Sequence, residues 1–253
     1  MIATMTTILA VCISGVSIYS HLVHYTCPSQ QRYIIRLLFT CPLYAVTSCL
    51  CLRFWQHAVY FETIRDCYEA FIIYSFLVLI LEYAGGEANC VAKMQGLPPL
   101  RPPCPFCFLT DRPRTVRLLR ECKAGTLQFV VLKPFMALVS LIMASQGKLY
   151  DEGYQIAMLI IYNLAYSVAL YYLLFFYLAT KEACKQFKPI SKFAAVKSIV
   201  FATYYQSLLV RLLPNMTMER ALLWSDFILC VEMVVFAIAL SCVFVIWMFD
   251  SVP

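Results

Sequence analysis

The sequence predicts an all-α fold: a bundle of seven transmembrane helices, with the N-terminus outside and the C-terminus in the cytoplasm. Three observations predict it, namely the composition, the apolar stretches of bilayer length and the placement of the basic residues. Of the 253 residues, 62% are hydrophobic and 13% are charged, whereas a soluble domain has about 45–50% apolar and about 25% charged residues. We therefore expect one membrane domain covering residues 1–253.

Seven apolar stretches are long enough to cross a hydrocarbon core, which needs roughly 20 mostly apolar residues per helix. The first stretch has no charged residue over positions 1–10, and a cleaved signal peptide begins with basic residues, so we expect a retained span. A long connection, 85–125, separates the third stretch from the fourth; its proline, cysteine and basic residues favour an extended cytoplasmic loop. The predicted spans cover about 3–24, 36–55, 67–84, 126–145, 154–179, 196–213 and 221–249.

The placement of the basic residues predicts the orientation. If the N-terminus lies outside, most of the 20 lysines and arginines fall in the predicted cytoplasmic loops. An excess of Lys and Arg is typical of cytoplasmic loops in membrane proteins. The sequence NMT at 215–217 then lies on the outer side, where Asn215 is a candidate glycosylation site.

Two charged residues fall deep inside the predicted spans. At about 1.5 Å of rise per residue, Glu232 lies roughly 16 Å below the outer edge of the hydrocarbon core, and Lys133 lies roughly 10 Å above the inner edge. In a core about 30 Å thick, these two depths nearly coincide. One hypothesis is that Lys133 and Glu232 pair across helices; the other is that Lys133 snorkels to the inner headgroups.

Uncharged polar residues also fall within the apolar stretches. A polar layer near the middle of a bundle can hold a solute in a gap between helices. Such residues can equally hydrogen-bond between helices and only hold the bundle together. The polar layer consists of Tyr44, Ser48, Tyr74, Ser75, Asn163 and Gln206.

The third stretch is entered through the charged sequence FETIRDCYE at 61–69. Arg65 and Glu69 are four residues apart, so their side chains meet on one face of a helix. We expect Arg65 to neutralise Glu69, with Asp66 beside them, at the outer end of this span.

The same stretch leaves the membrane through EYAGGE at 82–87. Glu82 lies thirteen residues beyond Glu69, about 20 Å deeper and near the cytoplasmic edge. The glycines at 85 and 86 predict the end of the helix. Anchoring at the two membrane surfaces explains these charges, and a gate or vestibule is the alternative interpretation.

The long cytoplasmic loop contains CPFC at 104–107. A structural zinc site would need a second cysteine pair or histidines at ligand spacing, which this loop lacks. Two cysteines among prolines, phenylalanines and basic residues favour S-acylation of Cys104 and Cys107, with inert thiols or a metal site as alternatives. The sequence contains no nucleotide-binding loop, catalytic triad or zinc-protease motif, so we expect neither an enzyme nor a cofactor.

Several separate segments resemble one known family. The most specific is YFETIRDCYEAFIIYSFLVLILEYAGGE at 60–87. Supporting segments follow in order: CKAGTLQFVVLKP at 122–134, YDEGY at 150–154, FKPISKFAAVKSIVFATYYQ at 187–206 and DFILCVEM at 226–233. From about residue 36 to residue 233, the chain resembles the organic solute transporter alpha-subunit superfamily, most closely its transmembrane protein 184-like branch.

The resemblance implies a seven-helix membrane protein, N-terminus outside, linked to the transport of organic solutes such as steroid conjugates and bile acids. It also implies a lipidated cytoplasmic loop, matched here by Cys104 and Cys107, and a single-span partner subunit. We therefore expect a facilitative carrier for amphipathic organic solutes in the plasma membrane or an endomembrane. Its expected partners are membrane lipids, the solute and an accessory subunit or second copy, but no nucleic acid.

The alternative is a seven-helix receptor or signalling scaffold, although the third predicted helix ends in EYAGGE and not in an Asp-Arg-Tyr type motif. The candidate binding or gating residues are Glu232, Lys133, Asn163, Gln206, Tyr74, Ser75, Tyr44, Arg65, Asp66, Glu69 and Glu82.

Overall fold

The structure is a computed structural model that describes residues 1–25, 27–94, 97–102, 111–148, 151–181, 198–199, 206, 209–210 and 218–250. Within these ranges the named elements are helices, and one isolated antiparallel bridge joins Leu100 to Arg112. The prediction of an all-α fold is therefore confirmed.

The chain divides into two compact units, and the division falls inside one helix. Unit 1 comprises Met1–Tyr68 and Ile190–Pro253, and unit 2 comprises Glu69–Pro189. Helix α4 (Ala58–Tyr83) begins in unit 1 and ends in unit 2. A single helix therefore carries side chains that belong to both units.

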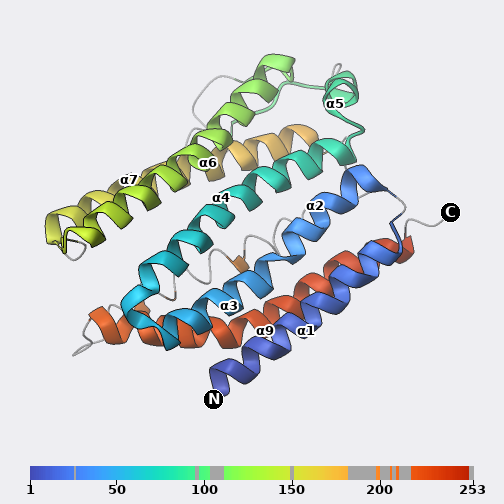
Figure 1. The fold of residues 1–253 in the computed structure, drawn as a ribbon. Helices are drawn as coiled ribbons and strands as arrows, with labels where there is room; N and C mark the ends of the chain where they lie inside the picture. Colours follow the sequence, from blue (N-terminus) through green and yellow to red (C-terminus); the bar gives the residue numbers. More distant parts are fainter. Residues whose placement is uncertain are drawn as a thin grey trace. The chain divides into compact units, whose positions relative to one another are not determined.

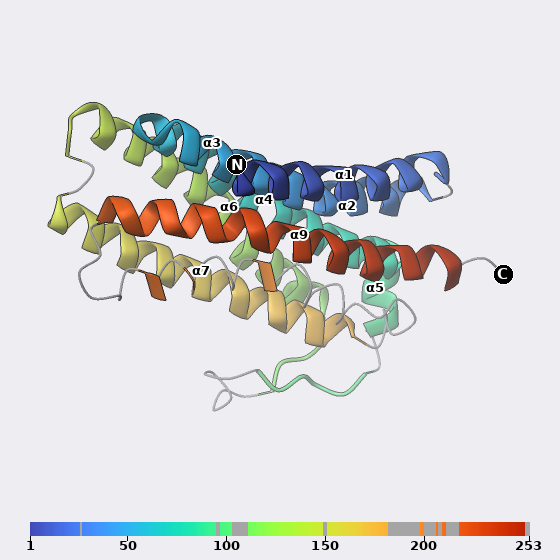
Figure 2. The ribbon, with the colours of Figure 1, turned by 90° about the horizontal axis from the view of Figure 1, so that it is seen from below.

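Unit 1 contains α1 (Ile2–Val23), α2 (Pro28–Leu38), α3 (Thr40–Arg53), the short 3₁₀ helix η1 (Trp55–His57) and α9 (Met218–Asp250). Helices α1, α3 and α9 pack against one another, and Figures 1 and 2 show the blue α1 beside the red α9. Small residues at such contacts let helix backbones approach closely.

The face of α1 that contacts the other helices consists mainly of polar residues, although α1 as a whole is apolar. Its buried residues follow one another at intervals of three or four, which places them in one stripe: Thr7, Ala10, Ser14, Ser17 and His21. The Ser17 hydroxyl donates to the Ser241 hydroxyl of α9 at 2.6 Å, and the Thr7 hydroxyl donates to the Ala45 carbonyl of α3 at 3.3 Å. These hydrogen bonds bind α1 to its neighbours.

The second predicted span is longer than the sequence indicated and is interrupted. Helix begins at Pro28, a residue suited to the first helical position because it lacks an N–H. The break between α2 and α3 lies at Phe39, just after Leu38. Pro42 explains the position of the break, because its ring crowds the carbonyl of the residue four places earlier and offers no hydrogen bond to it.

Unit 2 contains the end of α4, α5 (Glu87–Met94), α6 (Val116–Ser145) and α7 (Glu152–Thr180). Helices α6 and α7 pack against each other along their length and are joined by a short connection, as expected of antiparallel neighbours (Figure 1). At Gly125 of α6 the Tyr172 ring of α7 comes so close that no side chain would fit between them. Asp151 caps the start of α7, because its carboxylate accepts a hydrogen bond from the Tyr154 amide at 3.3 Å.

The two glycines end α4 as predicted. The Gly86 amide donates to the Leu81 carbonyl at 2.9 Å and the Gly85 amide donates to the Glu82 carbonyl at 3.1 Å. Both glycines have positive φ angles, of 88° and 90°. This pair of bonds is the Schellman arrangement that satisfies the last carbonyls of a helix. Glu87 then begins α5, and α4 and α5 meet at a bend of 64°.

Within the described part of the chain, five helices are long and apolar enough to cross a membrane: 2–23, 28–53, 116–145, 152–180 and 220–244. The count rises to six if α4 and α5 form one bent span. The predicted sixth span, 196–213, lies largely outside the described residues, as do Cys104, Cys107 and Asn215.

Two helices begin well before the predicted spans, for one reason. The third helix begins at Ala58 and not near residue 67, and the fourth begins at Val116 and not near residue 126. The early turns of α4 and α6 carry charged residues. A search for apolar stretches leaves such residues out, although charged side chains are compatible with a helix. As a consequence, Arg65, Asp66 and Glu69 lie well inside α4 and not at its outer end.

Candidate functional site

Two clusters of polar and charged side chains lie between the long helices, one in each unit. The Arg65 cluster, in unit 1, consists of Arg65, Asp226, Ser48 and Tyr44. The Lys133 cluster, in unit 2, consists of Lys133, Glu69, Tyr162 and Phe129. Because charges in a membrane are costly unless they are paired, each cluster is a candidate for function as well as for structure.

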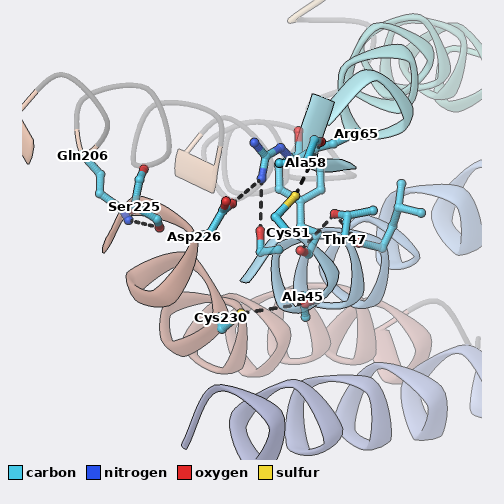
Figure 3. A network of polar contacts seen from close by, with 12 residues as sticks. Ala45, Thr47, Cys51, Ala58, Arg65, Gln206, Ser225, Asp226 and Cys230 are labelled. Atoms are coloured by element: carbon cyan, nitrogen blue, oxygen red, sulfur yellow. Dashed lines mark hydrogen bonds and ion pairs between the residues drawn. The ribbon is translucent and has the colours of Figure 1, made fainter. Parts of the chain in front are cut away.

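In the Arg65 cluster, one guanidinium joins three helices (Figure 3). The Arg65 Nη1 atom of α4 lies 3.1 Å from the Asp226 Oδ1 atom of α9 and donates to the Ser48 hydroxyl of α3 at 3.0 Å. The guanidinium carbon also lies 6.0 Å from the centre of the Tyr44 ring. Tyr44 and Ser48 share a face of α3 because they are four residues apart.

The surroundings of this ion pair are mostly closed to water. The exposed fraction is 19% for the Arg65 side chain and 8% for the Asp226 side chain, and Tyr44 and Ser48 are buried. One turn along α9, the Cys230 thiol donates to the Ala45 carbonyl of α3 at 3.8 Å (Figure 3). The Arg65 cluster therefore holds α3, α4 and α9 together through polar contacts that have few competing waters.

In the Lys133 cluster, an ammonium lies against the Glu69 carboxylate and two aromatic rings. The Lys133 Nζ atom of α6 lies 2.5 Å from the Glu69 Oε2 atom of α4. It also lies 4.1 Å from the ring centre of Tyr162 in α7 and 5.7 Å from that of Phe129 in α6. Both distances are within the range of cation–π attraction. The exposed fraction is 1% for the Lys133 side chain and 11% for the Glu69 side chain.

Helical spacing explains how three helices supply this cluster. Phe129 lies four residues before Lys133 on α6, so the two share a face. The Tyr162 hydroxyl of α7 donates to Glu69 Oε2 at 3.3 Å, which gives the carboxylate a second partner besides the ammonium. The Tyr162 ring stacks on Tyr166, one turn further along α7, at 6.5 Å. The result is a charge pair bounded on one side by aromatic rings.

Two sequence-based hypotheses about partners are wrong. Lys133 pairs with Glu69 and not with Glu232, and its burial rules out snorkelling. Arg65 pairs with Asp226, so it does not neutralise Glu69 as the spacing on α4 indicated. The reason is that depth and spacing do not report how a helix is rotated, and rotation decides which neighbour a side chain faces.

Of the remaining predicted site residues, Asp66 interacts electrostatically with Arg65, and the others lie outside both clusters. Glu232 is half-buried, and its Oε2 atom has no hydrogen-bond partner among the described residues. The Asn163 amide donates to the Leu159 carbonyl of its own helix at 2.7 Å, and the Gln206 amide donates to the Ser225 carbonyl at 2.7 Å. Tyr74 is 40% exposed and Ser75 is buried.

Asp66 and Glu82 are half-buried residues of α4, with Glu82 in its last turn. Sequence reasoning missed Asp226 and Tyr162 as site residues. Asp226 had a signal, because it is an acidic residue in the first half of a largely apolar helix. Tyr162 had no such signal, because nothing in the sequence distinguishes it from the other tyrosines among the 17 of the chain.

Metal ligands are not gathered in the described parts of the chain, where no group of three His, Cys, Asp or Glu side chains could hold an ion. The two clusters offer ion pairing, hydrogen bonding and contact with aromatic faces.

A sequence model described as organic solute transporter Ostalpha matches residues 1–248. The chain belongs to the organic solute transporter Ostalpha family. This match covers nearly the whole chain and confirms the resemblance stated on the segments between residues 36 and 233. Together with the five apolar helices, it makes the chain an integral, multi-pass membrane protein of a transporter family. No solved structure matches the chain.

Membership of a transporter family gives the two clusters a context. A transporter needs a place within the membrane where part of a solute is held, and it needs contacts between helices that can open and reform. The Lys133 cluster and the Arg65 cluster, which both lie between helices, are candidate positions for such contacts.

Proposed function

We propose that this member of the organic solute transporter Ostalpha family is a facilitative carrier for amphipathic organic solutes of the steroid-conjugate or bile-acid type. The solute is held between helices, and the Lys133 cluster is the observation that carries the proposal. A buried ammonium beside two aromatic rings offers both a charge and a flat apolar surface, and an amphipathic solute presents both of these to its carrier.

The closed state of the cluster fits a carrier better than an open pore. Lys133 is almost completely enclosed and its ammonium is already paired. A solute can reach it only if the surrounding helices move apart, as alternating access requires. The proposed driving force is the gradient of the solute itself.

The deciding experiment is solute flux into proteoliposomes containing the purified chain, compared with protein-free liposomes. A panel of sterol sulfates and bile acids is offered on one side, and uptake is measured with and without unlabelled solute preloaded on the other. A carrier is expected to show saturable uptake that the preloaded solute accelerates. Absence of flux for the whole panel, with or without a candidate single-span partner, would contradict the proposal.

The predicted orientation is part of the same proposal. The N-terminus is placed outside and the 85–125 loop in the cytoplasm because the basic residues gather in the predicted inner loops. Protease added to the cytoplasmic side of sealed membranes should cut that loop and spare an epitope at the N-terminus. The reverse pattern would contradict the orientation.

Lipidation of the cytoplasmic loop is proposed for Cys104 and Cys107. Acyl chains on these cysteines would hold the loop at the inner leaflet next to its basic residues. Replacing both cysteines by serine should remove a hydroxylamine-sensitive lipid label from the protein. An unchanged label would place the acylation elsewhere.

A further inference from the structure

The ion pair of the Lys133 cluster differs from a second lysine–glutamate pair, whose lysine lies on the same helix, α6. Lys123 of α6 pairs with Glu87, and the exposed fractions of these two side chains are 33% and 45%. Lys133 pairs with Glu69, and the corresponding fractions are 1% and 11%. The chemistry of the two pairs is the same, so the difference is the environment. Water screens the first pair, whereas the second must hold its own charges.

A structural role alone does not account for a charge pair in this position. Replacing a buried ion pair by apolar residues is often neutral or stabilising, because the pair has to overcome the cost of removing both charges from water. Helices α6 and α7 already pack through apolar and aromatic contacts, among them Phe129 against Tyr162 at 5.9 Å. The packing of α6 on α7 therefore does not depend on the charges of the Lys133 cluster, which are available for a role in binding.

The surroundings of the ammonium suit an anion attached to a rigid apolar body. Tyr162 and Tyr166 present nearly parallel rings, with an angle of 17° between them, and Phe129 contacts both. These three rings gather aromatic surface beside the Lys133 ammonium. A sulfate or carboxylate could take the position of the Glu69 carboxylate on Lys133, while the apolar body of the solute lies along the rings.

The Glu69 carboxylate keeps a hydrogen-bond partner when it separates from the Lys133 ammonium. Its Oε2 atom accepts a hydrogen bond from the Tyr162 hydroxyl as well as from Lys133. If an external anion binds the Lys133 ammonium, the Tyr162 hydroxyl can still donate a hydrogen bond to the displaced Glu69 carboxylate. Without a solute, the glutamate keeps the buried ammonium paired and the cluster closed.

We propose that Lys133 binds the anionic group of the solute and that Glu69 is its internal counter-ion, which an anionic solute displaces. This inference rests on the proposed carrier function and adds the residues that set its preference for anions. Glu69 competes with the solute for Lys133, so it lowers the apparent affinity and allows release on the far side.

The test measures binding by purified protein in detergent, using a radiolabelled sterol sulfate and, as the uncharged probe, a sterol glucoside. E69Q removes the competing charge and is expected to tighten sulfate binding by about tenfold. K133Q is expected to weaken sulfate binding by at least about tenfold, because a charge-assisted contact is lost. Glucoside binding should change by less than about threefold in either variant, since no charge is involved.

K123Q is the matched control, because it neutralises an exposed, glutamate-paired lysine of the same helix. Its sulfate binding should stay within about twofold of the wild type, since an exposed pair contributes little. Sulfate binding that weakens in E69Q, or that is unchanged in K133Q, would overturn the proposal.

E69Q leaves a buried ammonium without its carboxylate and can impair folding. The double variant E69Q/K133Q removes both charges and is therefore the second test. It is expected to bind the glucoside like the wild type and to lose any preference for the sulfate over the glucoside. A sulfate preference retained in the double variant would overturn the proposal.

Flux measurements separate this inference from the carrier function on which it rests. Sulfate binding that depends on Lys133, without flux in proteoliposomes, would contradict the carrier and support the anion site. Saturable sulfate flux that is the same in wild type and K133Q would support the carrier and overturn the anion site.

Discussion

Neutralising Asp226 is the perturbation that tests the Arg65 cluster most directly. D226N keeps the shape of the side chain and an oxygen that can accept a hydrogen bond, but it removes the negative charge. The Arg65 guanidinium would then keep the Ser48 hydroxyl, the face of Tyr44 and the electrostatic attraction of Glu62 and Asp66, which is weaker than that of Asp226. None of these replaces the direct ion pair, so we expect D226N to destabilise the fold.

The magnitude follows from burial. Breaking a buried ion pair by removing one partner costs roughly 3–5 kcal/mol. With exposed fractions of 19% for Arg65 and 8% for Asp226, some water reaches the pair, and the remaining amide oxygen recovers part of one hydrogen bond. We therefore expect a loss of about 3 kcal/mol, a roughly hundredfold change in the ratio of folded to unfolded protein.

Reversible unfolding in mixed detergent micelles, followed by circular dichroism, measures this free energy. E121Q is the control. Glu121 pairs with Arg117 and with Arg112, and the exposed fractions are 36% for Glu121, 88% for Arg117 and 45% for Arg112. Each such surface pair contributes about 0.5 kcal/mol or less. The double variant R65M/D226L should recover most of the stability lost in D226N, because neither charge then remains buried.

Two results would refute this reasoning about the Arg65 cluster. One is a loss in D226N no larger than that in E121Q, which would mean that the guanidinium finds solvent. The other is a double variant R65M/D226L less stable than D226N, which would mean that the charges are not coupled.

Three further predictions concern glycines. G125A should destabilise the fold by about 1–2 kcal/mol, because the added methyl would overlap the Tyr172 ring. In α1, the methyl added by G15A meets no neighbour within 4 Å, so this substitution should stabilise the fold by about 0.5–1 kcal/mol. The same unfolding assay measures both, and equal signs would contradict the packing of α6 on α7. G86A, at φ +90°, should cost about 1–2 kcal/mol through backbone strain alone. G86N should cost less than G86A, because asparagine tolerates a positive φ better than alanine does; an equal or greater loss would contradict the positive φ at this turn.

The lengths of three long helices were predictable from the residues alone. α1, α7 and α9 begin and end within a few residues of the predicted spans, because a long apolar stretch bounded by polar residues has few other stable forms in a membrane. The stop at Gly85 and Gly86 was predictable for a local reason, since two adjacent glycines provide the positive φ angles that a helix end favours.

Helix starts were less predictable where charges precede the apolar part. α4 and α6 begin nine or ten residues earlier than expected, at Ala58 and Val116. Apolar length indicates where a helix meets lipid, whereas the helix itself continues as long as its backbone hydrogen bonds are favourable. This difference moved Arg65 and Glu69 from the predicted end of a helix to its interior.

The sequence by itself determined an all-α membrane protein, its family and the residues that carry charge inside the apolar helices. Only the tertiary structure decided the partners of those charges: Asp226 for Arg65, and Glu69 for Lys133. The physical reason is that spacing along a helix specifies which side chains share a face, but not which other helix that face meets. Arg65 and Glu69 share a face of α4, and each is nevertheless neutralised by a residue more than sixty positions away.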